Sequence, residues 1–144
     1  MPPSDRRVAD GIEDRSAPCH HLLGRRVLSA ERDSGQSEVR FEAPPSMSNG
    51  TGSVQGGFLA AMLDSAMGAA LATVLQEGER PPTLEMKINF IKPAQVGTIA
   101  GSGHVVHRGK SVAFIEGQLR DESGSLLATG TSTNLIQLRA RDAG

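Results

Sequence analysis

Residues 57–76 read GFLAAMLDSAMGAALATVLQ, and this stretch is the clearest structural signal in the chain. It is rich in alanine, leucine and methionine and contains no proline, so it predicts a long α-helix. Apolar residues lie nearly all the way round that helix, which indicates a helix that is buried on most sides or spans a membrane. Asp64, the many alanines and the lack of flanking Lys or Arg clusters argue against a membrane span. We therefore expect a helix that is wrapped by a curved sheet.

The residues after this helix predict antiparallel strands. In residues 83–91 four apolar side chains alternate with polar ones, namely Leu84, Met86, Ile88 and Phe90. This period of two is typical of a strand with one buried face. Three more strands are expected, separated by short turns, at 96–107, 111–120 and 126–137. Consecutive strands that are joined by short turns are antiparallel, so the chain should end in a three-strand meander.

The residues before the helix predict two further strands, at 24–32 and 36–41, around the turn Asp33-Ser34-Gly35. A Gly, Ser and Asn loop follows at 46–54, and such loops often carry function. The expected fold class is α+β, with one helix packed in a curled antiparallel sheet. We expect a disordered tail at 1–18, one domain at 19–137 and a C-terminal tail at 138–144.

Composition excludes several classes of function. The 144 residues fit one domain, and 15 Lys and Arg nearly balance 16 Asp and Glu, so neither nucleic acid nor a membrane surface is an expected partner. There are four Phe and no Trp or Tyr, which leaves little for base stacking. The single Cys19 excludes an intrachain disulfide and suits a reducing cytoplasm. The N-terminal residues lack the apolar segment of a secretory signal, so we expect a cytoplasmic protein.

Asp64 is the first residue whose chemistry needs an explanation. A carboxylate within an apolar helix is costly unless hydrogen bonds or charges compensate it. One reading is a structural aspartate that accepts a hydrogen bond from a neighbouring segment. The other is a catalytic carboxylate that serves as a base or nucleophile.

The helix start, Gln55-Gly56-Gly57, is the second chemical feature. The first N–H groups of a helix lack internal partners and lie at the positive end of its dipole. Because Gly56 and Gly57 have no side chains, a substrate carbonyl could approach these groups and develop negative charge there. The alternative is that the two glycines only permit a tight turn into the helix.

Helix geometry separates the two features. Asp64 follows Gly56 by eight residues, which is about 12 Å along a helix axis. Two copies of the helix, packed antiparallel in a two-fold dimer, could bring Asp64 of one copy beside Gly56 of the other. We therefore expect a composite site in a homo-oligomer, as a dimer or a homotetrameric dimer of dimers.

The motif spacing resembles that of the PaaI-type hotdog thioesterases, the phenylacetyl-CoA thioesterase family. The residues that carry the resemblance are NGTGSVQGG at 49–57, LD at 63–64, Gly68, NFIKPA at 89–94, Gly97 and GKS at 109–111. The likeness covers roughly residues 40 to 137. It implies a hotdog fold, in which the curved sheet wraps the long helix, and an acyl-CoA thioesterase activity.

The resemblance also implies roles for individual residues. The backbone N–H of Gly56, helped by the side chain of Asn49, would polarise the thioester carbonyl. Asp64 of the facing protomer would activate water or attack the thioester, and the Thr83 hydroxyl would position the water. Gln55 stands where the family most often has histidine, and glutamine can donate a hydrogen bond but cannot titrate.

The loop at 108–110 is a candidate contact for the substrate. Arg108 and Lys110 could bind the phosphates of coenzyme A, although an ordinary solvated turn would look the same. Gly57 completes the expected substrate contacts at the helix start. Because CoA is part of the substrate, no separate cofactor is expected.

Metal chemistry is not expected. Cys19-His20-His21 is the only local cluster of ligand types, and the remaining His104 and His107 are three residues apart in an expected strand, which would place them on opposite faces.

The sequence thus predicts hydrolysis of a small or medium acyl-CoA or aryl-CoA thioester to a free acid and CoA. Two alternatives stay open. An enoyl-thioester hydratase on the same fold would ordinarily pair Asp with a histidine, and a non-catalytic acyl-CoA binding module would be compatible with Gln55.

Overall fold

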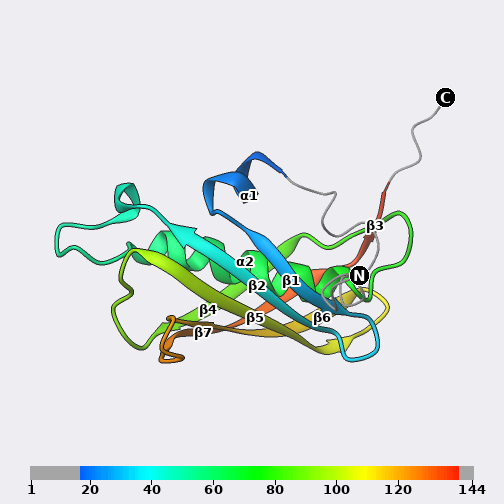
Figure 1. Cartoon of the computed structure of the whole chain (residues 1–144). Coiled ribbons are helices and arrows are strands. Elements are labelled where there is room, and N and C mark those ends of the chain that lie inside the picture. The colour runs from blue at the N-terminus through cyan, green and yellow to red at the C-terminus, as the bar shows by residue number, and fades with distance from the viewer. Residues whose placement is uncertain (1–16, 140–144) are drawn as a thin grey trace, which may run out of the picture.

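The computed structural model describes residues 17–139 of the chain (Figure 1). Its elements, in chain order, are α1 (Pro18–Leu22), β1 (Arg26–Glu31), β2 (Gln36–Ala43), the 3-10 helix η2 (Pro45–Met47), α2 (Gly56–Ala72), β3 (Glu79–Arg80), β4 (Thr83–Phe90), β5 (Gly97–Arg108), β6 (Val112–Arg120), β7 (Leu126–Leu135) and β8 (Gln137–Leu138). The expected α+β class, one long helix with an antiparallel sheet, is confirmed.

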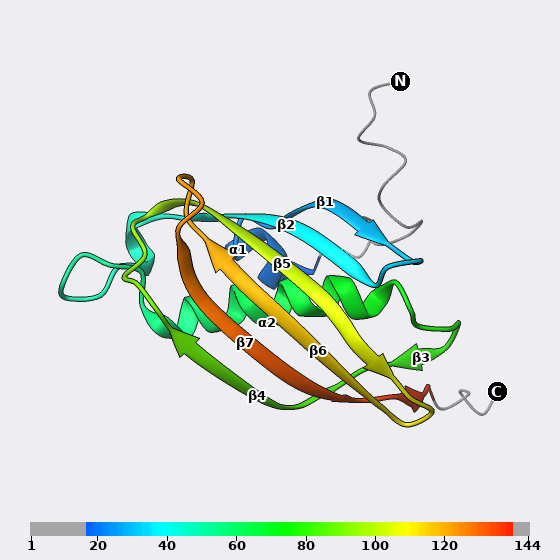
Figure 2. The same cartoon turned by 90° about the horizontal axis from the view of Figure 1, so that it is seen from below.

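Six strands form one antiparallel sheet in the order β1-β2-β5-β6-β7-β4. The meander of β5, β6 and β7 is the one that the turn signals predicted. Strand β4 does not lie beside β5, its neighbour in sequence, but pairs with β7 and forms one edge of the sheet. Figure 2 shows the sheet curling around α2, with β1 and β4 at its two edges. The short strands β3 and β8 form a separate pair.

The core lies between α2 and the inner face of the sheet. The helix contributes eight buried residues, Leu59, Met62, Leu63, Ala66, Met67, Ala69, Ala70 and Leu71. They pack against apolar side chains that alternate inward along the strands, such as Val39 and Phe41 of β2 and Ile115 and Leu119 of β6. Burial of this apolar surface is the main force that holds the helix in the sheet.

Glycines on the inner face let α2 approach the sheet closely. The four positions are Gly101, Gly103, Gly117 and Gly130, and the last three are register partners across β5, β6 and β7. A Cβ atom on Gly103 would lie 2.6 Å from the carbonyl oxygen of Ala66, and one on Gly117 would lie 2.7 Å from Cγ of Met67. Alanine at either position would therefore collide with the helix.

One side of α2 is not covered. Gly57, Phe58, Ala61, Asp64 and Gly68 are exposed, and their spacing puts them on one face of the helix. The helix is therefore buried on the side that meets the sheet and exposed on the other, so the prediction of burial on most sides is only partly correct. The helix also ends earlier than the predicted Gln76, at Ala72, where the Thr73 hydroxyl donates to the carbonyl of Ala70 at 2.7 Å.

The strand limits differ slightly from those predicted. The last strand, expected at 126–137, ends at Leu135, and Gln137–Leu138 forms β8 against β3. The tails expected at 1–18 and 138–144 lie largely outside the described residues; inside them, α1 begins at Pro18 and β8 ends at Leu138. Within residues 17–139 no helix combines the length and apolarity needed to cross a membrane.

The prediction that His104 and His107 point to opposite faces is wrong. A shift in the β5–β6 register between Val105 and His107 inserts an extra residue in β5. His104 therefore pairs with Glu116 and His107 with Phe114, and both histidines lie on the outer face. Across residues 17–139 no group of three or more metal-ligating side chains is found.

Candidate active site

Asp64 lies in the middle of α2, on the exposed side of the helix. The hydroxyl of Thr83, at the first position of β4, donates to Oδ1 of Asp64 at 3.2 Å. The carboxylate therefore has a fixed partner for one oxygen, while no hydrogen bond to Oδ2 is found among the described residues. This arrangement combines the two readings of Asp64, because a neighbouring strand orients the carboxylate and one oxygen remains available.

The start of α2 offers backbone donors. The carbonyl of Gln55 accepts hydrogen bonds from the N–H groups of Phe58 and Leu59, at 3.0 and 3.3 Å. No side chain caps the helix, and no partner is found within residues 17–139 for the N–H groups of Gly56 and Gly57. Two donors at the positive end of the helix dipole are therefore available to an oxyanion.

Asn49 stabilises the loop that leads into this helix start. Its Oδ1 accepts three hydrogen bonds, from the backbone and hydroxyl of Thr51 at 3.0 and 2.8 Å and from the backbone of Ser53 at 3.1 Å. Because the carbonyl oxygen of the amide is engaged, its Nδ2 is left as a free donor in the described structure. A backbone hydrogen bond also joins the two ends of this loop, because Gln55 N donates to Met47 O at 2.9 Å.

Aromatic side chains lie at the same end of α2. A Cβ atom on Gly56 would lie 3.1 Å from Cζ of Phe90, so the Phe90 ring stands against the first residue of the helix. Phe58 belongs to the first helical turn, and both rings are substantially exposed in the single chain. Two of the four phenylalanines of the chain are therefore next to the backbone donors.

The other predicted site residues are placed as follows. The Gln55 side chain is exposed and has no hydrogen bond among the described residues. Arg108 forms an ion pair with Glu79, and this hydrogen bond lowers the pKa of Glu79. Lys110 is exposed in the β5–β6 hairpin and has no partner in residues 17–139. The guanidinium of Arg108 is thus already engaged, whereas the Lys110 ammonium is available.

The structure brings some predicted residues together and keeps others apart. Thr83 contacts Asp64 directly. In the sheet, Arg108 of β5 lies opposite Ala113 of β6. Ala113 in turn lies opposite Asn134 of β7, and Asn134 lies opposite Thr83 of β4. The hairpin that carries Lys110 is therefore at the same end of the sheet as Thr83 (Figure 2). Gly56 and Asp64 are separated along one helix, as the eight-residue spacing requires.

Two buried residues of β7 next to this cluster were not predicted from the sequence. Asn134 donates to the Thr83 hydroxyl at 3.0 Å, and Ser132 donates to Asn134 at 2.9 Å. The only sequence signal is that both fall on the buried alternation of the strand, where polar residues need a partner.

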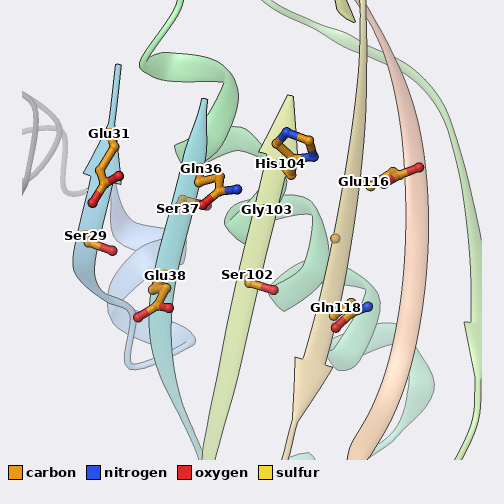
Figure 3. A pocket seen from close by; sticks show the side chains of 11 residues that line it. Ser29, Glu31, Gln36, Ser37, Glu38, Ser102, Gly103, His104, Glu116 and Gln118 are labelled. Atoms are coloured by element: carbon orange, nitrogen blue, oxygen red, sulfur yellow. The ribbon is translucent and has the colours of Figure 1, made fainter. Parts of the chain in front are cut away.

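A separate hollow of about 350 Å³ lies on the outer face of the sheet, across β1, β2, β5 and β6 (Figure 3). Its polar side chains include Glu31, Glu38, His104 and Glu116, and α2 lies behind the strands. None of the predicted site residues lines it. We therefore place the candidate active site on the α2 side.

Comparison with known proteins identifies the family of this chain. The family model of the thioesterase superfamily matches residues 51–128, more than half of the chain. This stretch contains the helix start, Asp64 and Thr83.

Three similar proteins illustrate the likeness. The structure of a phenylacetic acid degradation-related protein from Ralstonia eutropha, a candidate thioesterase, is 31% identical, has a TM-score of 0.80 and covers 85% of this chain and 92% of its own. An N33D mutant of the phenylacetic acid degradation protein PaaI from Thermus thermophilus is 25% identical, with a TM-score of 0.74 and coverage of 83% and 98%. A candidate esterase of Saccharolobus solfataricus is 28% identical over 105 residues, 73% of each chain.

Fold, motif spacing and family match thus lead to one assignment. The six-stranded antiparallel sheet around a long helix is the hotdog arrangement that the sequence resemblance implied. The chain belongs to the thioesterase superfamily, as a PaaI-like hotdog protein that hydrolyses thioesters.

Proposed function

We propose that the protein is an acyl-CoA thioesterase whose active site is shared between two protomers. The observation that carries the proposal is the exposed carboxylate of Asp64, held by Thr83 on the uncovered side of the helix whose free N-terminus offers backbone donors. A base or nucleophile and an oxyanion site are the two elements that thioester hydrolysis needs. They lie eight residues apart on one helix, about 12 Å, so a second copy of the chain has to bring them together.

The uncovered surfaces of the single chain support a dimer. Strand β4 is an edge strand, and exposed edges are ordinarily protected or paired. Leu84 and Phe90 of β4 are 60% and 56% exposed, and Phe58 of α2 is 36% exposed. A two-fold contact through β4 and the open face of α2 would bury these side chains and would place Asp64 of one protomer near Gly56 of the other.

The reaction follows from these groups. The N–H of Gly56 and Nδ2 of Asn49 would hold the carbonyl oxygen of the thioester. A water held by Asp64 and Thr83 would add to the carbonyl carbon while its proton passes to Asp64. The tetrahedral intermediate would then expel the CoA thiolate, which takes up the proton and leaves the free acid. An attack by the Asp64 carboxylate itself would give an anhydride that water then opens.

The acyl group is proposed to be short, medium or aryl. Phe58 and Phe90 provide apolar and aromatic surface beside the oxyanion donors. Two similar proteins carry names that refer to phenylacetic acid degradation, which favours including an arylacetyl thioester among the substrates. Lys110 is the better candidate for a CoA phosphate, because Arg108 is already paired with Glu79.

Release of free thiol from a panel of acyl-CoA esters tests the activity. The panel should contain short, long and arylacetyl esters, with Asp64→Ala beside the wild type. We expect turnover of at least one ester and its loss in Asp64→Ala, while the oligomer stays intact. Tight binding of the esters without turnover would instead support a binding module, and Gln55→His would then be the variant to make.

Mixing two variants of very low activity tests the shared site. Asp64→Ala removes the carboxylate, and Gly56→Pro removes the Gly56 N–H from the oxyanion site. In a mixed dimer one site is complete and the other lacks both groups. Half of randomly assembled dimers are mixed, so we expect about a quarter of the wild-type activity to return on co-expression. No recovery would mean that both groups act within one chain.

A further inference from the structure

A chain of hydrogen bonds runs from the interior of β7 to the carboxylate of Asp64. Ser132 donates to Oδ1 of Asn134 at 2.9 Å, and Nδ2 of Asn134 donates to the Thr83 hydroxyl at 3.0 Å. Thr83 in turn donates to Asp64 at 3.2 Å. Ser132 and Asn134 are only 3% and 5% exposed. Two buried polar side chains therefore support the candidate catalytic pair, Thr83 and Asp64, through hydrogen bonds.

The direction of these hydrogen bonds is fixed by groups that can only accept. Nδ2 of Asn134 also lies 2.9 Å from the carbonyl oxygen of Pro81, which has no proton to give. The amide nitrogen must therefore face Pro81 and Thr83, and the amide oxygen must face Ser132. The Thr83 oxygen accepts from Asn134, so its single proton is directed to the Asp64 carboxylate, which is also an acceptor.

The direction of these hydrogen bonds decides how Thr83 can bind the attacking water. A hydroxyl has one proton and two lone pairs. In Thr83 the proton is given to Asp64 and one lone pair accepts from Asn134. One lone pair remains, so Thr83 can only accept from a water that also donates to Oδ2 of Asp64. A water that gives both protons away presents its own lone pair to the thioester carbonyl.

We propose that Asn134, held by Ser132 and Pro81, is a positioning residue that directs the Thr83 proton to Asp64 and so keeps Thr83 and Asp64 as acceptors for the attacking water. The role rests on the proposed hydrolysis at Asp64, and it assigns a function to a residue outside the motif region. Asn134 does not touch the substrate and acts through Thr83.

Asn134→Asp is the decisive variant. It nearly preserves the shape of the side chain but replaces a donor by an acceptor, so the Thr83 proton would be drawn away from Asp64. Asn134→Ala removes the donor without adding an acceptor, and Thr83 could still donate to Asp64. Asn89→Asp is the matched control, because Asn89 is an exposed residue whose amide faces the Thr129 hydroxyl at 3.5 Å across the same two strands.

The variants should differ in kcat rather than in KM. We expect Asn134→Asp to lower kcat about 10- to 100-fold, part of what a general base contributes, with KM changed less than about twofold because no substrate contact is lost. Asn134→Ala should lose less activity than Asn134→Asp, and Asn89→Asp should match the wild type. A purely structural role would instead make kcat follow the melting temperatures of the variants. A kcat of Asn134→Asp within twofold of the control would overturn the proposal.

Three further variants decide the matter if Asn134→Asp does not fold. Ser132→Ala should lower kcat several-fold, and Thr83→Ser should keep most activity while Thr83→Val loses it. Equal activity of Thr83→Ser and Thr83→Val would overturn the proposed water site. The wild type is measured first on the ester panel: a wild type without turnover would refute the proposed function, whereas an active wild type with unaffected Asn134 variants refutes only the positioning role.

Discussion

Replacing Gly56 by proline would delete one hydrogen-bond donor from the candidate oxyanion site and little else. Gly56 is the first residue of α2, where proline is favoured because that N–H has no partner within the helix. The preceding Gln55 has φ −61° and ψ 141°, the extended conformation that a residue before proline prefers. The helix should therefore still begin at the same residue.

The magnitude of the effect follows from the local geometry. Loss of one oxyanion donor costs about 10²–10³ in kcat, or about 2.7–4 kcal/mol of transition-state stabilisation. Asn49 and the N–H of Gly57 would remain, so we expect a loss near 10². Folding stability should change by less than about 1 kcal/mol, since proline reduces the freedom of the unfolded chain and a Cβ atom at this position meets only the movable end of Phe90, at 3.1 Å.

Gly56→Ala is the control, because it adds the same Cβ atom beside Phe90 but keeps the N–H. Thiol release should be measured for both variants over a range of ester concentrations, together with thermal unfolding and the size of the oligomer. Gly56→Ala should retain most of its kcat, whereas Gly56→Pro should not. Equal kcat values for the two variants would show that the N–H of Gly56 does not stabilise the oxyanion.

Three further outcomes are expected. Asn49→Asp keeps the acceptor that holds its loop and loses the free donor, so kcat should fall about tenfold or more, with an unchanged melting temperature in thermal unfolding. Gly103→Ala should lower the free energy of unfolding by about 1–3 kcal/mol, because the new Cβ would lie 2.6 Å from a helix carbonyl oxygen; in urea unfolding Gly50→Ala, in open space, should not be destabilised. Hydrogen bonds, first from the Ser123 hydroxyl, lower the pKa of Asp121 from 3.8 to about 2. Its ionised form therefore stabilises the fold above pH 3.8, and this contribution disappears as the pH falls towards 2. In urea unfolding at several pH values, Asp121→Asn should be less stable than the wild type at pH 5 and should lose that difference near pH 2.

Much of the fold could be predicted from local patterns. The apolar stretch around Asp64 predicted α2, and the period of two in residues 83–91 predicted β4 within one residue at its end. Helix propensity and alternation act over a few residues, so they can be read from the chain itself. The motif resemblance gave Thr83 and Asp64 roles at the attacking water, but the hydrogen bond between them was not predicted from the sequence.

Other features depend on contacts between distant residues. The place of β4 beside β7 is set by how the sheet closes around α2, and no turn signal reports it. The shift in β5 that puts His104 and His107 on one face adds a residue without any glycine or proline to mark it. In the sequence Asn134 is an ordinary polar residue of a strand, and only its hydrogen bond to Thr83 in the folded protein indicates a function for it.

The close approach of α2 to Gly103 makes the position of Asp64 mechanically stiff. At Gly103 the helix lies nearly on the strand backbone, because the atoms nearest to a Cβ there would be the backbone carbonyl oxygen of Ala66 and the short side chains of Ala70 and Ser37. Catalytic groups need to be held within about half an ångström of their working position. The distance of the Asp64 carboxylate from the sheet is thus set by a contact with the helix backbone that cannot change its rotamer, so a substitution at Gly103 would displace Asp64 without touching it.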